Sequence, residues 1–472
     1  MKMEIRTVLI TIQFIFFIGH SEQKCYTVNN KGIEYTIIHE IMGQDSNLQC
    51  HNILSNEEND IALEEINNRA IRSSLKKITY TNSSLTQLTS GMFRQFTGVT
   101  EIHLNFSEVS NIELDAFKGL SRLTKLNLQG NNIGTIFTGI LNSLLSLTEL
   151  DLSNNVIQRV EEKAFLGAND LEVLNISFNR ISESLDILKI LKKLENLDVS
   201  YNLISNLGEK LELVQLRTAN FKNNQIRTLN TSTFSMMSHL RSLDLSSNFI
   251  NSIAEDTFVS LKNLTKLNLR NNSIIRLPLG MFRNSTALLE LDLSMNGLNY
   301  LEVGDFTGLE SLQILDLSFN ELSDLPKGIL HTINNLQTVY INNNYLKRIN
   351  VVDLNLMQVS AIFMDYNAWC CEILADTITE MGKEKVRLGR EFNSSNIHGI
   401  ACTFCENNDD DDTTSKRWND VVQVQSALEN VKSWFWSSPF VEFFQSGYKN
   451  TAFFLYLNNT IMRQQMQEVR TY

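Results

Sequence analysis

Residues 147–157 read Leu147-Thr-Glu-Leu150-Asp-Leu152-Ser-Asn-Asn155-Val-Ile157, a run of spaced leucines that ends on an asparagine. The same pattern recurs in thirteen units along the chain, 24 residues apart except at three steps of 22 or 23 residues. The units begin at Leu75, Val99, Leu123, Leu147, Leu171, Leu194, Leu216, Leu240, Leu264, Leu288, Leu312, Leu336 and Val359. A single unit cannot bury its own apolar face, so we expect the units to stack around one continuous core.

The leucines inside each unit predict a short strand. The residues at the fourth and sixth places, such as Leu150 and Leu152, are expected to point inward. Because side chains alternate along a strand, Glu149, Asp151 and Ser153 then point outward. Parallel strands from successive units would form one ribbon, and the outward side chains would line the concave face of the stack.

Two other places in the unit have a mechanical interpretation. The ninth place is asparagine in eleven of the thirteen units, from Asn131 to Asn367, and its amide can satisfy backbone groups where the chain turns. Phenylalanine recurs eighteen residues after the unit start, and these rings are predicted to stack as a spine on the convex side. They are Phe93, Phe117, Phe165, Phe234, Phe258, Phe282 and Phe306, whereas Lys189 and Glu212 occupy this place in two other units.

The expected fold is an α/β solenoid, a horseshoe with a parallel β-ribbon on its concave face. Over about residues 75–370 the chain resembles extracellular leucine-rich-repeat proteins of the common 24-residue type. Because the two end units would expose apolar edges, we expect a cap at each end. The predicted layout is a front cap over residues 22–74, repeats over 75–369 and a cysteine-containing rear cap over 370–405.

Both termini carry distinct segments. Residues 1–21 are predicted to be a secretory signal peptide, because Lys2 and Arg6 precede the apolar run Val8–Ile18. That run is too short to span a bilayer, and no other membrane span is expected, so we predict a secreted, extracellular protein. An acidic linker over residues 406–414 leads to an aromatic-rich helical tail over 415–472, which either folds back on the solenoid or contacts a partner.

Secretion predicts disulfides and glycans. Six cysteines flank the repeats: Cys25, Cys50, Cys370, Cys371, Cys402 and Cys405. We expect Cys25 to pair with Cys50, and the adjacent Cys370 and Cys371 to pair with the other two rather than with each other, since a bond between neighbours is strained. An unpaired Cys370 would be the candidate for a bond between chains. Nine glycosylation sequons begin at Asn82, Asn105, Asn175, Asn230, Asn263, Asn271, Asn284, Asn393 and Asn458.

Composition and motifs favour a binding protein over an enzyme. The formal net charge is −12, so the basic footprint of a nucleic-acid-binding protein is absent. The seven histidines are scattered, and the sequence lacks the common hydrolase, metalloprotease and phosphate-binding motifs. We therefore expect no catalytic residue, no metal site and no cofactor, and we expect the partner to be another protein.

The concave face is the default binding surface of a solenoid. Aspartate recurs at the fifth place of the repeat unit, which lies in the middle of this face. These aspartates either form an acidic stripe that meets a basic partner or simply belong to the repeat consensus, and we favour the consensus. Because a glycan on Asn175 would block part of this face, we prefer its rear half, where aromatic residues can anchor an interface unless they pack under the rear cap. The candidate partner-binding residues are Asp244, Asp292, Asp316, Tyr340 and Phe363.

A closer resemblance rests on the chain ends. Asn367-Ala-Trp369-Cys370-Cys371, with further cysteines near Cys402, is similar to the cap of insect leucine-rich immune molecules. Those secreted haemolymph proteins pair through disulfides and coiled coils and hold a complement-like thioester protein. The resemblance implies innate immune recognition, with a complement-like protein or a related leucine-rich-repeat chain as partner in a disulfide-linked dimer.

This chain departs from that family in two places. Ile373 stands where the next cap cysteine usually lies, and the tail carries at most two heptads, from Val421 to Phe435, instead of a long coiled coil. The missing cysteine puts the connectivity of the cap in doubt, and the short tail puts covalent pairing and complement holding in doubt. A secreted adhesion or matrix protein and a receptor-like ectodomain are the rival interpretations.

Overall fold

The computed structural model describes most of the repeat region and parts of its two ends. The described residues are 24–29, 32–34, 46–51, 75–81, 85–208, 210–352, 354, 356, 359–382, 385–387, 396–397 and 400–402. All of them belong to one compact unit, Met1–Phe404. The predicted signal peptide, acidic linker and tail lie outside the described residues, as do Cys405, Asn82, Asn393 and Asn458.

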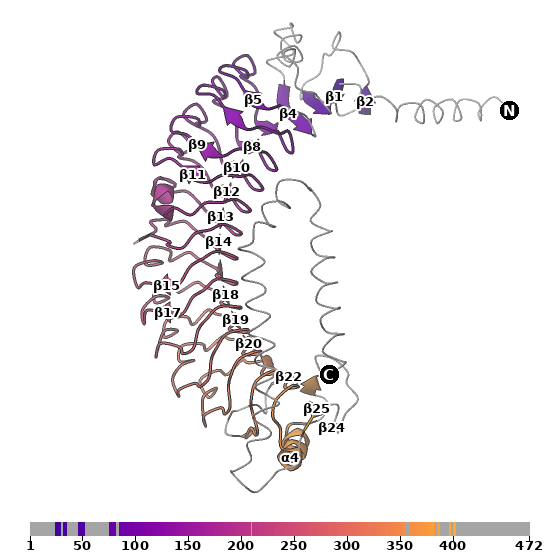
Figure 1. The fold of residues 1–472 in the computed structure, drawn as a ribbon, viewed down its shortest axis with the longest axis vertical. Helices are drawn as coiled ribbons and strands as arrows, with labels where there is room; N and C mark the ends of the chain where they lie inside the picture. Colours follow the sequence, from indigo (N-terminus) through magenta and orange to yellow (C-terminus); the bar gives the residue numbers. More distant parts are fainter. Residues whose placement is uncertain are drawn as a thin grey trace, which may run out of the picture. The chain divides into compact units, whose positions relative to one another are not determined.

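Each repeat unit contributes one strand to a parallel ribbon (Figure 1). The strands are β4 (Leu75–Thr81), β6 (Glu101–His103), β8 (Lys125–Asn127), β10 (Glu149–Asp151), β12 (Val173–Asn175), β13 (Asn196–Asp198), β14 (Thr218–Asn220), β16 (Ser242–Asp244), β18 (Lys266–Asn268), β19 (Glu290–Asp292), β20 (Ile314–Asp316), β21 (Thr338–Tyr340) and β22 (Ala361–Phe363). Every strand pairs in parallel with the next, place for place, so that Leu150 lies between Leu126 and Leu174. The predicted leucine-rich-repeat solenoid is confirmed.

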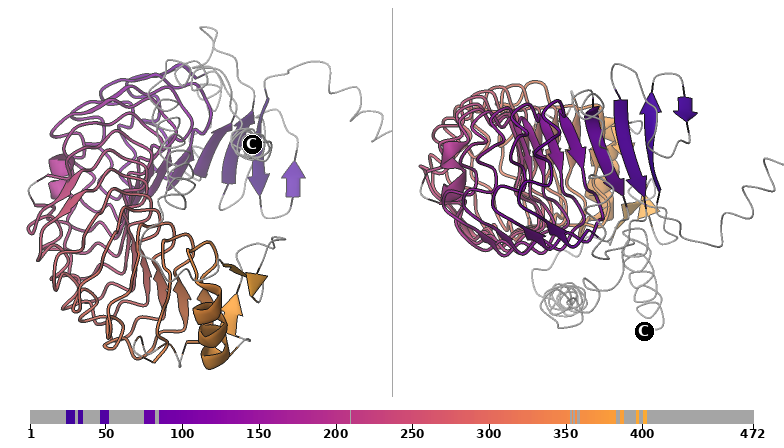
Figure 2. Two further views of the ribbon diagram at one scale, coloured as in Figure 1. Left: turned by 60° about the horizontal axis from the view of Figure 1, so that its bottom comes forward. Right: turned by 90° about the horizontal axis from the view of Figure 1, so that it is seen from above.

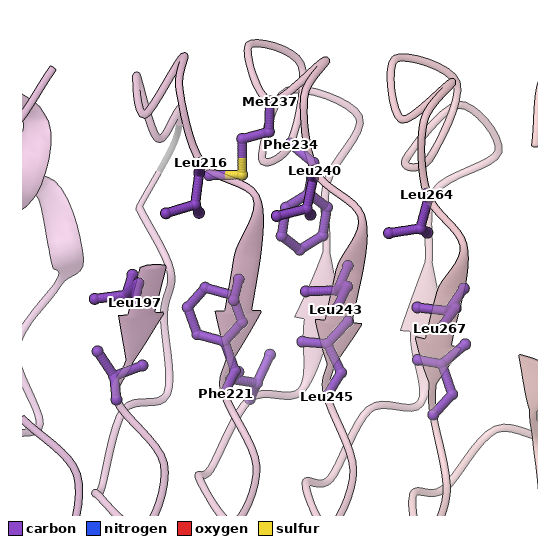
Figure 3. Packing of buried hydrophobic residues seen from close by; sticks show 14 of the residues in the cluster. Leu197, Leu216, Phe221, Phe234, Met237, Leu240, Leu243, Leu245, Leu264 and Leu267 are labelled. Atoms are coloured by element: carbon purple, nitrogen blue, oxygen red, sulfur yellow. The ribbon is translucent and has the colours of Figure 1, made fainter. Parts of the chain in front are cut away.

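The repeated leucines form the core between neighbouring coils (Figure 3). First-place and fourth-place residues are buried; Leu240 is 0% exposed and Leu243 is 1% exposed. Sixth-place residues, such as Phe221 and Leu245, are fully buried beside them. Each coil therefore buries its apolar side chains against the coil before it and the coil after it, as the period of the sequence predicts.

The ninth-place asparagines form the expected ladder. Asn155 is typical: its Nδ2 donates to the carbonyl of Leu152 in its own coil at 3.0 Å and to that of Leu128 in the preceding coil at 2.9 Å. Its Oδ1 accepts the backbone N–H of Ile133 at 3.1 Å. The same pattern of bonds within and between coils recurs at Asn131, Asn179, Asn202, Asn224, Asn248, Asn272, Asn296, Asn320, Asn344 and Asn367.

The phenylalanine spine is present, and all seven rings are buried. Phe258 stacks on Phe234, with ring centroids 6.0 Å apart, and on Phe282, with centroids 6.4 Å apart. Where the spine is interrupted, the 3₁₀ helix η1 (Leu185–Ile190) fills the convex side with Leu185 and Leu188. Short two-residue strands pair on the convex side of other coils: β5 (Gln87–Leu88) with β7 (Asn111–Ile112), β9 (Thr135–Ile136) with β11 (Arg159–Val160), and β15 (Thr228–Leu229) with β17 (Ser252–Ile253).

The front cap extends the ribbon (Figure 2). Strand β3 (Ser46–His51) runs parallel to β4, and it pairs antiparallel with β1 (Lys24–Asn29), which in turn pairs antiparallel with β2 (Gly32–Glu34). Together with the repeat strands and one strand of the rear cap, they make a 17-stranded sheet. Cys25 and Cys50 are directly opposite each other in the register of β1 and β3, and their disulfide remains a prediction.

The rear cap begins at Trp369, which is 1% exposed and donates from Nε1 to the carbonyl of Met364 at 2.6 Å. Helix α4 (Cys371–Met381) follows, and strand β23 (Val386–Arg387) then adds to the ribbon in parallel with β22. Strands β24 (Asn396–Ile397) and β25 (Ile400–Ala401) then form a short antiparallel pair. Cys402 directly follows β25, and a disulfide joins it to Cys371. Cys370 is also disulfide-bonded. The bond between Cys371 and Cys402 agrees with the expected pairing, and Cys370 is not the unpaired cysteine that a bond between chains would need.

Candidate protein-binding face

The five predicted partner-binding residues lie on the concave ribbon in one row. In the register of the strands, Asp244 pairs with Asn268, Asn268 with Asp292, Asp292 with Asp316, Asp316 with Tyr340, and Tyr340 with Phe363. All of them are half-exposed. The structure thus brings the predicted residues together, with Asn268 completing the row.

Each aspartate in the row has a structural task, as the consensus interpretation expects. The Asp316 Oδ1 accepts the backbone N–H of Ser318 at 2.9 Å and its hydroxyl at 2.6 Å, which ends the strand in a turn. Asp292 accepts the same two bonds from Ser294, at 2.9 and 2.5 Å. An asparagine can do this work, because Asn268 accepts the N–H of Arg270 at 3.0 Å.

The second carboxylate oxygens distinguish Asp292 and Asp316 from Asp198 and Asp244. Asp198 Oδ2 accepts from the amide of Asn220 at 3.0 Å, and Asp244 Oδ2 accepts from that of Asn268 at 3.4 Å. Asp292 and Asp316 are direct neighbours with no amide between them, and no donor among the described residues bonds to either Oδ2. The row therefore carries an open acidic pair at β19 and β20.

The environment of Asp316 reflects this arrangement. Burial raises the pKa of the Asp316 carboxyl above its usual range, and the charge of Asp292 acts in the same direction. The hydrogen bonds from Ser318 and the positive charge of Arg270 oppose that effect without cancelling it. Arg270 is engaged next to the pair, since its Nη1 donates to Ser294 Oγ at 2.6 Å. Burial is therefore the main influence on the Asp316 carboxyl, and Asp292 adds to it.

The third place of the ribbon changes character along the solenoid. Cross-strand ion pairs join Lys77 to Glu101 at 3.1 Å, Lys125 to Glu149 at 2.8 Å, and Lys266 to Glu290 at 2.8 Å. Such exposed pairs contribute little stability, but they neutralise this column. After Glu290 the third place holds Ile314, which is 37% exposed, then Thr338 and Ala361. The rear of the ribbon is therefore uncharged at this place.

Tyr340 and Phe363 form the most prominent feature of the rear ribbon. Their rings stack with centroids 4.5 Å apart and 12° between the planes. Strand β23 continues the ribbon beside them, with Arg387 in register with Phe363, and both rings stay half-exposed. We use the name rear concave patch for Asp292, Ile314, Asp316, Tyr340 and Phe363.

A second aromatic pair was not predicted. Phe178 and Tyr201 stack with centroids 4.1 Å apart on the rim of the ribbon, and Phe178 is 42% exposed. Both residues stand directly before a ninth-place asparagine and have positive φ values of 52° and 55°. The eighth place holds Asn154 and Asn223 in other coils, which tolerate this conformation better than an aromatic residue does. Comparing residues at the eighth place would have revealed this pair.

The described sequons are distributed over several faces. Asn175 lies on the concave row in β12, and Asn271 lies on the rim with a φ of 54°. Asn230 and Asn263 are exposed, whereas Asn105 and Asn284 are half-buried. Among the described sequons, none lies on β19 to β22, so the rear concave patch would be free of glycan.

The described residues contain no group of three or more His, Cys, Asp or Glu side chains arranged to hold a metal ion. No helix in this part of the chain is both long enough and apolar enough to cross a bilayer.

The repeats and the parallel ribbon give this chain the fold of a leucine-rich-repeat solenoid, which is typical of non-catalytic scaffolds for protein interaction. The family model described as leucine rich repeat matches residues 73–133, 121–181, 214–274 and 262–322. No curated protein sequence matches the chain.

Three solved structures share the fold. The leucine-rich-repeat protein LIC12759 of Leptospira interrogans is 21% identical, with a TM-score of 0.58, over 67% of this chain and 79% of that chain. The leucine-rich-repeat domain of APL1 is 19% identical, with a TM-score of 0.60, over 76% of this chain and 100% of that chain. A chain of the Drosophila Toll–Spatzle complex is 20% identical, with a TM-score of 0.60, over 75% of this chain and 48% of that chain.

Proposed function

We propose that this chain is a secreted scaffold that binds another protein through the rear concave patch and acts in innate immune recognition. The observation that carries the proposal is the half-exposed stack of Tyr340 and Phe363 on an open sheet face. Aromatic residues at the centre of a surface supply much of the binding energy in protein interfaces. The open acidic pair beside the stack adds specificity to the same surface.

The immune assignment is supported by the kind of protein that shares this fold. The Toll–Spatzle complex is described as a hub in Drosophila development and innate immunity. The cap sequence resembles that of the insect leucine-rich immune molecules, so a complement-like thioester protein is the first partner to test. The proposal includes the signal peptide and the glycans. A glycan on Asn175 would cover part of the front half of the ribbon and leave the rear half free of it.

The double substitution Tyr340→Ser and Phe363→Ser is expected to abolish capture of the partner, with a loss of affinity of about 100-fold or more. The full-length protein, immobilised and exposed to native extracellular fluid, should retain a partner that mass spectrometry identifies. Both rings are half-exposed, so their replacement should leave the buried core intact.

The matched control is Phe178→Ser with Tyr201→Ser, which removes a comparable stack from the rim. This control should retain the partner. If the rim variant loses the partner while the concave variant keeps it, the binding surface has been assigned to the wrong face. If both variants keep it, neither aromatic pair anchors the interface.

A further inference from the structure

The geometry points to the chemistry of the partner: we propose that the rear concave patch binds an extended segment that presents a basic side chain between Asp316 and Tyr340. An apolar neighbour in that segment would pack on Phe363 and Ile314. This inference rests on the proposed function, because it concerns the same face of the ribbon. It names what the partner must offer there.

The charge of the patch selects a cation. Asp292 and Asp316 occupy paired positions on β19 and β20, and neighbouring strands lie about 4.8 Å apart. In each carboxylate one oxygen is held by its own serine, while the other has no donor from the described residues. A lysine or arginine of the partner can therefore bond to these second oxygens without breaking a contact among the described residues.

The nearby positive charges leave this acidic pair open. Lys266, on the adjacent strand β18, is paired with Glu290 at 2.8 Å. Arg270 donates to Ser294, and its positive charge does not cancel the effects of burial and of Asp292 on the pKa of Asp316. Arg387 follows Phe363 in the register of the ribbon, so two strands, β21 and β22, separate it from the acidic pair.

The aromatic pair suits the same occupant. Tyr340 is next to Asp316 in the register of β20 and β21, so a cation bound to the carboxylate would also lie near the face or edge of the tyrosine ring. Cations are attracted to aromatic faces, and the contact strengthens when water is excluded. Ile314 and Phe363 give the rest of the segment an apolar surface. A basic residue flanked by an apolar one matches these three features together.

The sequence itself supplies a conservative test of the charge. Asparagine already occupies the fifth place at Asn127, Asn220 and Asn268, where its Oδ1 accepts the same turn N–H that the aspartates accept. The substitutions Asp292→Asn and Asp316→Asn should therefore preserve the turns and remove only the charges. The matched control is Asp151→Asn with Asp198→Asn, which removes two charges from the same row in earlier coils.

The probe is a random peptide library displayed on phage and selected against the full-length protein. We expect the selected peptides to contain a lysine or arginine beside an apolar residue, and we expect high salt to weaken their binding. Asp292→Asn with Asp316→Asn should lower the affinity of the best synthetic peptide about tenfold or more. The Asp151 and Asp198 control should bind it like the unsubstituted protein.

Two kinds of failure are distinguishable. Peptides that require Tyr340 and Phe363 but lack basic residues, or that bind the Asp292 and Asp316 variant unchanged, overturn the basic-segment inference and leave the binding face in place. A selection that returns no peptide dependent on Tyr340 and Phe363 counts against the proposed function itself.

Discussion

Replacing Asn248 with alanine is expected to lower the free energy of unfolding by about 4 kcal/mol. Its Nδ2 donates to the carbonyls of Phe221 and Leu245 at 3.0 Å each, and its Oδ1 accepts the N–H of Ile226 at 3.1 Å. Asn248 is only 5% exposed, so water cannot replace these bonds. Each buried group that loses its partner costs about 1–3 kcal/mol, and the substitution leaves several such groups.

Denaturant unfolding of the full-length protein measures this loss of stability. Asn248→Asp has nearly the same size, but it replaces the amide donor with an acceptor facing carbonyl oxygens, so it should destabilise the protein at least as strongly as alanine does. Asn335→Ala is the control, because Asn335 is exposed and donates one bond to the Glu310 carbonyl at 2.9 Å. Equal stability of the Asn248 and Asn335 alanine variants would show that the ladder is not what holds neighbouring coils together.

The second large effect is expected at the phenylalanine spine. Phe258→Ala should lower the free energy of unfolding by about 3–5 kcal/mol, because it opens a cavity between Phe234 and Phe282 in a fully buried position. Phe258→Leu should cost clearly less, since Leu141 fills the eighteenth-residue place of its own unit and is buried there.

The spine variants are measured in the same unfolding experiment. Val303→Ala provides the exposed reference, because Val303 lies on the surface with 56% exposure. We expect this reference to stay within about 0.5 kcal/mol of the unsubstituted protein. Alanine and leucine at position 258 with the same small effect would mean that the stacked rings do not contribute to the core.

Most of the fold follows from the sequence because its interactions repeat. A leucine at the fourth place meets the same place of the next coil, and the strand alternation places Asp151 outward once Leu150 is inward. The ninth-place asparagine bonds within its own turn and to the adjacent coil, so its position relative to the strand predicts its partners. These rules are local and need no knowledge of distant contacts.

The site was predictable only in part, because its character depends on differences between coils. Alternation places Tyr340 and Phe363 outward, but whether their rings are covered depends on where β23 joins the ribbon. The open acidic pair depends on which residue lies opposite each second carboxylate oxygen: an asparagine beside Asp244 and an aspartate beside Asp292. The consensus interpretation described the shared task of these aspartates and missed the difference between them.

The disulfides of the rear cap were also predictable from the sequence only in part. The sequence left the pairing of Cys370 and Cys371 open, because spacing alone cannot tell adjacent cysteines apart. Helix α4 starts at Cys371, and its disulfide to Cys402 fixes the segment that follows the helix. The bonded state of Cys370 removes the free thiol that the resemblance to paired immune molecules would have used.

The central claim is that the partner binds to the rear concave patch. Hydroxyl-radical footprinting of the full-length protein, alone and with the captured partner, tests it most directly. Tyr340, Phe363, Phe178 and Tyr201 are reactive aromatic residues, and all four are at least partly exposed. The claim predicts that the partner slows oxidation of Tyr340 and Phe363 and leaves Phe178 and Tyr201 unchanged. Unaltered oxidation of Tyr340 and Phe363 in the complex would contradict it.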